Sequence, residues 1–188
     1  MNPEPPTSGS VAHPDDDATR NLCLWPFGDP HAAARLEREL CTTGTDPVVL
    51  ADGALLTWRP GRRVPHLREP QNIGRSRPLG LGFWGLLFGI VVAGPELAAS
   101  AQQSTVGLDE SLRPVGIDPE LVSAVRLALV PGTSALAAWC DDPTADLITL
   151  AARSSRVVTV SGPPGGPVAV RWQLSDHHSS ELRRIFAV

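Results

Sequence analysis

Cys23 and Cys140 are the residues whose type best suits nucleophilic chemistry, because a thiol becomes a reactive thiolate when a base lies beside it. His31 follows the first cysteine closely enough to be weighed as that base. Both cysteines fall in apolar segments that we expect to form neighbouring strands, and free cysteine is among the most buried residue types. We therefore interpret Cys23 and Cys140 as small core residues rather than nucleophiles.

The remaining candidates for chemistry have simpler structural interpretations. The odd number of cysteines, three in all, and the lack of a Cys-x-x-Cys pair do not fit a zinc ribbon or a disulfide framework. The run Asp176-His177-His178 does not suit one metal ion, because adjacent helical residues point in different directions. The hydroxyls of Thr133 and Ser134 follow Pro131-Gly132, which is typical of a helix end. No catalytic residue, metal ligand or cofactor is predicted, and the sequence favours a protein that is not an enzyme.

Composition limits the class of protein before any motif is considered. The chain has 188 residues, of which 42% are hydrophobic, enough to bury one core. The net charge of −4 excludes a globally basic nucleic-acid binder. The 17 glycines and 19 prolines exceed the usual combined share of about 12%, so part of the chain is loop or tail. Residues 1–20, which are Pro-, Ser- and Asp-rich and lack an apolar signal segment, are predicted to form a disordered N-terminal tail.

The elements that must position any site follow from caps and hydrophobic periodicity. The pairs Asp29-Pro30, Asp118-Pro119 and Asp142-Pro143 predict helix starts. After the first helix, a second strand or a hairpin with its turn at Asp52-Gly53 is predicted. The predicted strands cover residues 22–27, 48–50, 55–58, 133–139 and 156–160. The predicted helices cover residues 31–41 and 118–130 and a segment that begins at residue 142.

This order predicts an α+β fold, a ferredoxin-like split β-α-β sandwich interrupted by a Gly-rich apolar helical insertion. The domain is expected over residues 21–160, with the insertion at about 78–112. A small parallel α/β sheet is the alternative, and the short strands and brief first connection favour the former. Residues 161–188 are expected to be a Gly/Pro linker and a C-terminal extension, with one more strand at 168–174 and a short helix at 179–186.

The segment 79–94 contains no polar side chain and follows a stretch, 59–77, with six arginines and one glutamate. Sixteen helical residues span about 24 Å, less than the roughly 30 Å of a bilayer core. The return leg, 95–112, carries charges that would each cost about 3 kcal/mol inside a membrane. We therefore expect no membrane-spanning hairpin. The helix is instead a buried core helix, a surface for self-association, or an element that contacts a membrane interface.

Glycines at steps of four, followed by Ala93, give this helix a smooth face for close helix contact. The residues predicted at an oligomer or membrane interface are Phe83, Trp84, Gly85, Leu87, Phe88, Gly89, Val92 and Ala93. The residues predicted to form a basic flank, suited to anionic headgroups, are Arg62, Arg63, Arg75 and Arg77.

Three blocks of sequence resemble an uncharacterised family of small bacterial proteins. They are Phe-Trp-Gly-Leu-Leu-Phe-Gly at 83–89, Gly-Ile-Asp at 116–118 and Pro-Gly-Thr-Ser-Ala-Leu at 131–136. The family is a domain of unknown function usually labelled as a predicted membrane protein, and the resemblance covers residues 22–160. It implies a ferredoxin-like domain with a Gly-rich hydrophobic helical insert, and no catalytic residue carries over. The chain departs from the family at 95–112, which is polar where the family continues with a second apolar helix.

These observations predict a non-enzymatic, self-assembling scaffold or interaction protein in which the apolar helix joins subunits as a homo-oligomer. The first alternative is a peripheral or integral membrane-associated protein that uses the same helix and its arginine-rich flank on an anionic membrane surface. The second is a small-ligand sensor or enzyme on a ferredoxin-like sheet. Nucleic acid is not an expected partner. The expected location is the cytoplasm, or the cytoplasmic membrane under the first alternative.

Overall fold

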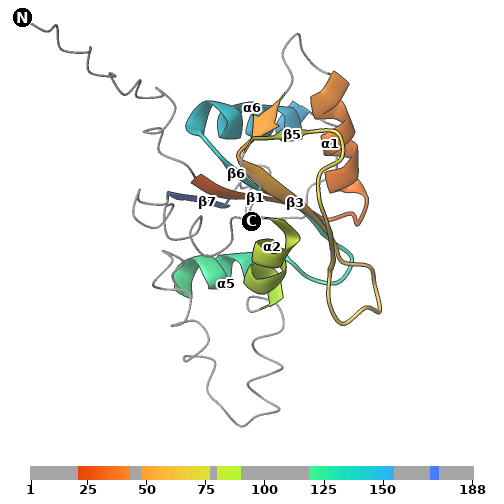
Figure 1. The fold of residues 1–188 in the computed structure, drawn as a ribbon. Coiled ribbons are helices and arrows are strands. Elements are labelled where there is room, and N and C mark those ends of the chain that lie inside the picture. Colours follow the sequence, from red (N-terminus) through yellow and green to blue (C-terminus); the bar gives the residue numbers. More distant parts are fainter. Residues whose placement is uncertain (1–20, 43–47, 77–79, 90–118, 155–169, 174–188) are drawn as a thin grey trace, which may run out of the picture.

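A computed structural model describes residues 21–42, 48–76, 80–89, 119–154 and 170–173. A five-stranded sheet in the order β4-β3-β6-β1-β7 forms the centre of the molecule (Figure 1), and each neighbouring pair in it is antiparallel. Its strands are β1 (Asn21–Phe27), β3 (Asp52–Thr57), β4 (His66–Arg68), β6 (Ser134–Cys140) and β7 (Val170–Gln173). A second, two-stranded parallel sheet joins β2 (Val49–Leu50) to β5 (Gly74–Arg75). The antiparallel main sheet excludes the alternative of a small parallel α/β sheet.

Helices cover both faces of the main sheet, so the fold is mixed α+β in three layers (Figure 1). Helices α1 (Ala32–Thr42) and α6 (Asp142–Ser154) lie on one face. Helices α2 (Gly80–Phe88) and α5 (Pro119–Ala128) lie on the other. Because β1 and β3 are each antiparallel to β6, which lies between them, they run parallel to one another.

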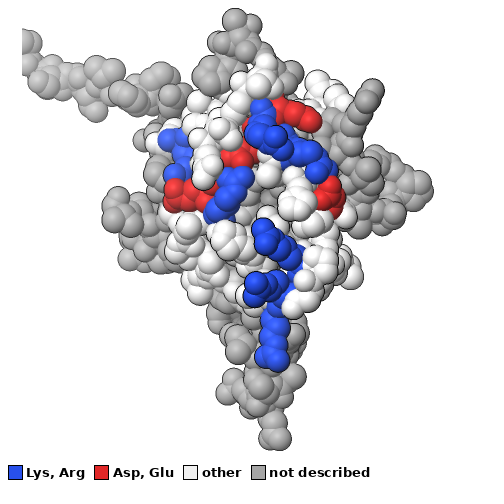
Figure 2. All heavy atoms as spheres, turned by 90° about the vertical axis from the view of Figure 1, so that its right-hand side faces the viewer, with Lys and Arg blue, Asp and Glu red and all other residues white. Residues whose placement is uncertain are grey.

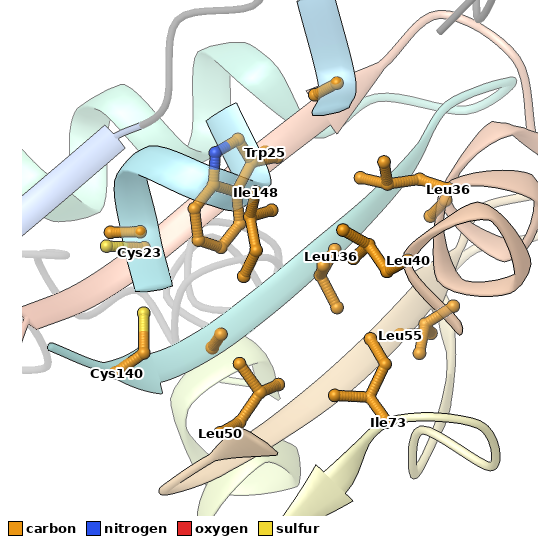
Figure 3. Close-up of a cluster of buried hydrophobic side chains, with 14 of the residues drawn as sticks. Cys23, Trp25, Leu36, Leu40, Leu50, Leu55, Ile73, Leu136, Cys140 and Ile148 are labelled. Carbon is orange, nitrogen blue, oxygen red and sulfur yellow. The ribbon is translucent and has the colours of Figure 1, made fainter. Parts of the chain in front are cut away.

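The two cores follow directly from the alternation of side chains along the strands. In β6, Leu136 and Ala138 face α1 and α6, whereas Ala137 and Trp139 face α2 and α5. Every residue of β6 is buried, which explains why its sequence lacks the polar alternation of a half-exposed strand. Figure 3 shows the core on the α1 and α6 side, where Trp25 and Ile148 lie among aliphatic side chains from three strands and both helices.

The predicted elements at 22–27, 31–41, 118–130, 133–139 and from 142 are confirmed to within one or two residues. The helix starts also behave as expected of N-caps. The Asp29 carboxylate accepts a hydrogen bond from the backbone N–H of His31 at 2.9 Å. At α6 the cap lies one residue earlier than predicted, because Asp141 accepts the bond from the N–H of Thr144.

The predicted hairpin at 48–58 is wrong. Asp52 and Gly53 lie inside β3, which pairs with β4 and β6, while β2 pairs in parallel with β5. Gly53 serves close packing rather than a turn, since a Cβ there would lie 2.9 Å from Leu50 Cδ1 and 3.0 Å from the carbonyl oxygen of Ala137.

The C-terminal segment contributes to the domain itself. Residues 170–173, within the strand predicted at 168–174, form β7 and pair with β1 at the edge of the main sheet. The expected extension at 161–188 therefore contains a strand of the central sheet. The N-terminal tail, the insertion beyond residue 89, the strand at 156–160 and the helix at 179–186 lie outside the described residues.

Candidate functional site on helix α2

Helix α2 has two faces that differ in side-chain size rather than in polarity. Phe83, Trp84, Leu87 and Phe88 are buried against the sheet. The rings of Phe83 and Trp84 meet edge to face with centroids 4.9 Å apart, and Trp84 stacks on Phe88 at 6.1 Å. Such aromatic pairs add to the stability gained from burial. The large side chains therefore fix which face of α2 points inward.

A buried hydrogen bond ties α2 to the sheet. The indole Nε1 of Trp84 donates to Asp52 Oδ2 at 2.9 Å, and both side chains are fully buried. Arg75 lies 3.5 Å from Asp52 Oδ1 and 2.6 Å from a carboxylate oxygen of Glu69. The hydrogen bond to Glu69 contributes most to a raised pKa of Arg75. Burying a carboxylate costs free energy unless it is paired and hydrogen-bonded. The contacts with Trp84 and Arg75 offset this cost for Asp52.

The outer face of α2 consists of Leu81, Gly82, Gly85, Leu86 and Gly89, and we call it the glycine face. All five residues are exposed, with Leu81 and Leu86 at 41% and 49%. A Cβ added at any of the three glycines would have no heavy atom within 4 Å. The glycines are thus not required by packing within the described part of the chain.

The structure divides the predicted interface residues into three groups. Phe83, Trp84, Leu87 and Phe88 lie in the core of this chain. Of the other predicted interface residues, Gly85 and Gly89 are exposed, and Val92 and Ala93 lie outside the described residues. Of the described residues of α2, those on the glycine face are therefore the ones that can contact another molecule. Sequence analysis missed Leu81, Gly82 and Leu86, although a plot of residue size at helical spacing separates them from the large residues.

The predicted basic flank is also divided. Arg75 belongs to the internal network around Asp52, and Arg77 lies outside the described residues. Arg62 and Arg63 are exposed in the loop between β3 and β4. Figure 2 faces this side of the molecule, and its lower half shows basic side chains without an acidic neighbour.

A second buried carboxylate, which sequence analysis missed, holds the segment after β4 to helix α1. Glu37 is only 1% exposed and binds Arg68 at 2.5 Å and the backbone N–H groups of Gln71 and Asn72. Burial opposes its ionisation, but these hydrogen bonds outweigh burial and lower the pKa of Glu37. Its spacing from Ala33 and Leu40, which share the buried face of α1, is the signal that could have found it.

Cys23 and Cys140 lie together in the core, on the adjacent strands β1 and β6, as predicted (Figure 3). The hydrogen bond from Cys140, aided by the charge of Arg171, outweighs burial and lowers the pKa of Cys23. The same contact and burial raise the pKa of Cys140. His31 is exposed beyond the far end of β1, so it is not placed to serve as their base. Thr133 and Ser134 are buried at the start of β6, where Ser134 bonds to the carbonyl oxygen of Asp29.

None of the helices in the described ranges is long and apolar enough to cross a bilayer. Within those same ranges, no cluster of three or more His, Cys, Asp or Glu side chains could hold a metal ion.

Fold and surface together define the class: a three-layer α+β protein with an apolar helix that is anchored by an internal tryptophan and open on a glycine face. The chain belongs to the family described as "Protein of unknown function (DUF1269)", whose model matches residues 79–187. An uncharacterised family was predicted, but over residues 22–160; the match instead begins just before α2 and continues past β7. No curated protein and no solved structure matches the chain.

Proposed function

We propose that this protein is a non-enzymatic scaffold whose subunits associate through the glycine face of α2. The observation that carries the proposal is the open space around Gly82, Gly85 and Gly89 on an otherwise apolar, firmly anchored helix. A glycine inside a helix costs about 1 kcal/mol relative to alanine. Gly82 and Gly85 lie inside α2, so the free helix gives up about 2 kcal/mol at positions where alanine would fit.

Close approach of a second helix explains this composition. Without Cβ atoms, the backbone of α2 can be met directly by a partner helix. Leu81 and Leu86 flank the glycines and are exposed. In a two-fold dimer the same surface is used by both subunits, so the leucines of one copy would pack over the glycines of the other. A second copy of this chain is therefore the partner whose shape the glycine face supports best.

The proposed framework for this helix is a ferredoxin-like domain. Support comes from the strand order β3-β6-β1-β7, from its antiparallel pairing, and from α1 and α6, which share one face of the sheet. In this proposal, α2 and α5 belong to an insertion between β3 and β6 and cover the face that the other two helices leave open. The insertion would then present the glycine face away from the sheet.

Light scattering of the purified, detergent-free protein over a range of concentrations tests the proposal. The wild type is expected to exceed the monomer mass of 19.9 kDa, and Gly85→Leu is expected to remain at it. Leucine is a good helix former, and its Cβ would meet open space at this exposed position, so the variant should fold. Ser123→Leu is the matched control, because it adds a leucine at an exposed position of α5. A monomeric wild type, or a Gly85→Leu variant that associates like the wild type, would contradict the proposal.

Membrane attachment through α2 is the alternative and makes a different prediction. Trp84 and Phe88 are buried, so lipid contact would have to use Leu81 and Leu86. Co-sedimentation of the wild type with vesicles, lost in Leu81→Ser/Leu86→Ser and accompanied by a monomeric mass without lipid, would favour this alternative over self-association.

A further inference from the structure

The loop between β3 and β4 begins with a tight turn that places two arginines next to each other. The turn is Arg59-Pro60-Gly61-Arg62, closed by a hydrogen bond of 3.2 Å from the N–H of Arg62 to the carbonyl oxygen of Arg59. Gly61 has a φ of 78°. Proline at the second position and glycine with positive φ at the third define a type II turn. In such a turn the first and fourth Cα atoms are less than about 7 Å apart, so Arg59 and Arg62 are neighbours.

The turn is fixed to the body of the protein by Trp58. The indole Nε1 of Trp58 donates to the carbonyl oxygen of Arg62 at 2.8 Å, so a second hydrogen bond holds the last residue of the turn. The backbone of Trp58 exchanges hydrogen bonds of 2.8 and 2.7 Å with Thr133 and Gly132, just before β6. The Trp58 ring also packs against the core beneath α2. The positions of Arg59 and Arg62 are therefore set by the fold rather than by a loose loop.

These arginines differ from the others in the same stretch of sequence. Arg68 binds Glu37, and Arg75 binds Glu69 and Asp52. Arg59, Arg62 and the adjacent Arg63 are exposed, and within the described residues their guanidinium groups form no ion pair. On the face shown in Figure 2, the basic side chains in the lower half stand apart from the acidic ones. Three cations within five residues, none of them paired with an acidic side chain of the described ranges, are a local exception in a chain of net charge −4.

We propose that this turn, which we call the arginine turn (residues 59–63), is a binding site for ligands that carry adjacent phosphate groups. The planar guanidinium fork binds a phosphate through two parallel hydrogen bonds. A phosphate group offers three strong acceptor oxygens and up to two charges, so neighbouring guanidinium groups can each bind one group of the ligand. The prearranged turn removes the conformational cost of bringing the backbones of the two arginines together. This site is separate from the glycine face and does not depend on self-association.

Isothermal titration with inorganic tripolyphosphate tests the site in the full chain, and vesicles of phosphatidylglycerol in phosphatidylcholine test a lipid source of the same chemistry. Arg59→Gln/Arg62→Gln is expected to weaken binding by about tenfold or more. The matched control is Arg38→Gln/Arg153→Gln, which removes the same charge at two other exposed positions and should bind within about twofold of the wild type, since distant surface charges are screened.

A third variant separates the geometry of the turn from its charge. Gly61→Val keeps every arginine, and its Cβ would meet no heavy atom within 4 Å, but a β-branched residue is strained at this positive φ. Weaker binding is expected, because the turn must open. A soluble ligand is supported if tripolyphosphate binds the wild type and the control pair but binds the turn pair and Gly61→Val more weakly. A lipid headgroup is supported if only the vesicles bind, with the same order among the variants. The proposal is overturned if neither probe binds, if the control pair loses as much affinity as the turn pair, or if Gly61→Val binds like the wild type.

Discussion

Replacing Trp84 by phenylalanine should measure how strongly the sheet holds helix α2. The change keeps an aromatic ring in a fully buried site and removes the indole N–H that donates to Asp52 at 2.9 Å. Trp25→Phe is a matched comparison, because Trp25 is equally buried and its Nε1 donates at 3.0 Å to the hydroxyl of Thr149. The two variants therefore lose the same atoms but differ in the charge of the acceptor left behind.

The expected difference follows from the energies of the two hydrogen bonds. Losing a bond to a neutral acceptor costs about 0.5–1.5 kcal/mol, and losing one to a charged group costs about 1.5–3 kcal/mol. The smaller ring leaves a cavity in both proteins, so that contribution largely cancels in the comparison. Trp84→Phe should therefore lower the free energy of unfolding by about 1 kcal/mol more than Trp25→Phe.

Urea unfolding followed by circular dichroism measures both changes, provided that the slope with denaturant is unchanged. Asp52→Asn should recover part of the loss in the Trp84→Phe background, since it removes the buried charge that lost its donor. If Trp84→Phe unfolds at the same urea concentration as Trp25→Phe, the buried carboxylate does not anchor α2 and the reasoning is refuted.

Two further predictions concern other buried contacts. The pKa of Glu37 is lowered in the folded protein. The stability that Glu37 contributes is therefore present above the ordinary glutamate pKa of 4.5 and is lost as the pH falls through the folded-state pKa. The urea midpoint of Glu37→Gln should fall less steeply between pH 7 and 3 than that of the wild type or of the exposed control Glu120→Gln. Gly53→Ala should destabilise by about 1–3 kcal/mol through overpacking against Leu50 and a strand carbonyl. A Gly53→Ala protein with an unchanged or higher urea midpoint would show that the strands can move apart freely.

The success of sequence analysis depended on whether the deciding signal was local. The Asp-Pro caps and the apolar runs predicted α1, α5, α6, β1 and β6, since these signals act within a few residues. The Asp52-Gly53 pair gave a wrong prediction because its usual turn preference is local, whereas its role here is set by Ala137 and Trp84, which the fold brings to it. Partners so distant in sequence leave no local pattern.

The candidate site shows the same division. The apolar character of 79–94 identified the helix, but hydropathy could not show that its large residues face inward, because glycine and leucine are both nonpolar. Residue size at helical spacing carried that information. The Pro60-Gly61 pair between two arginines was a local turn signal. The charge of the 59–77 stretch alone did not predict this turn. The sequence could not show that Arg75 forms ion pairs while Arg59 forms none with the described residues, because all arginines in this stretch look alike.

Within the described residues, the segment that the family model matches depends on strands and side chains that precede it. In the described residues, the match over 79–187 supplies two strands, β6 and β7, and these are not neighbours because β1 lies between them. The acceptor for Trp84, Asp52, also precedes the match. Residues 21–76 therefore provide both the strand that joins the halves of the sheet and the charge that fixes α2.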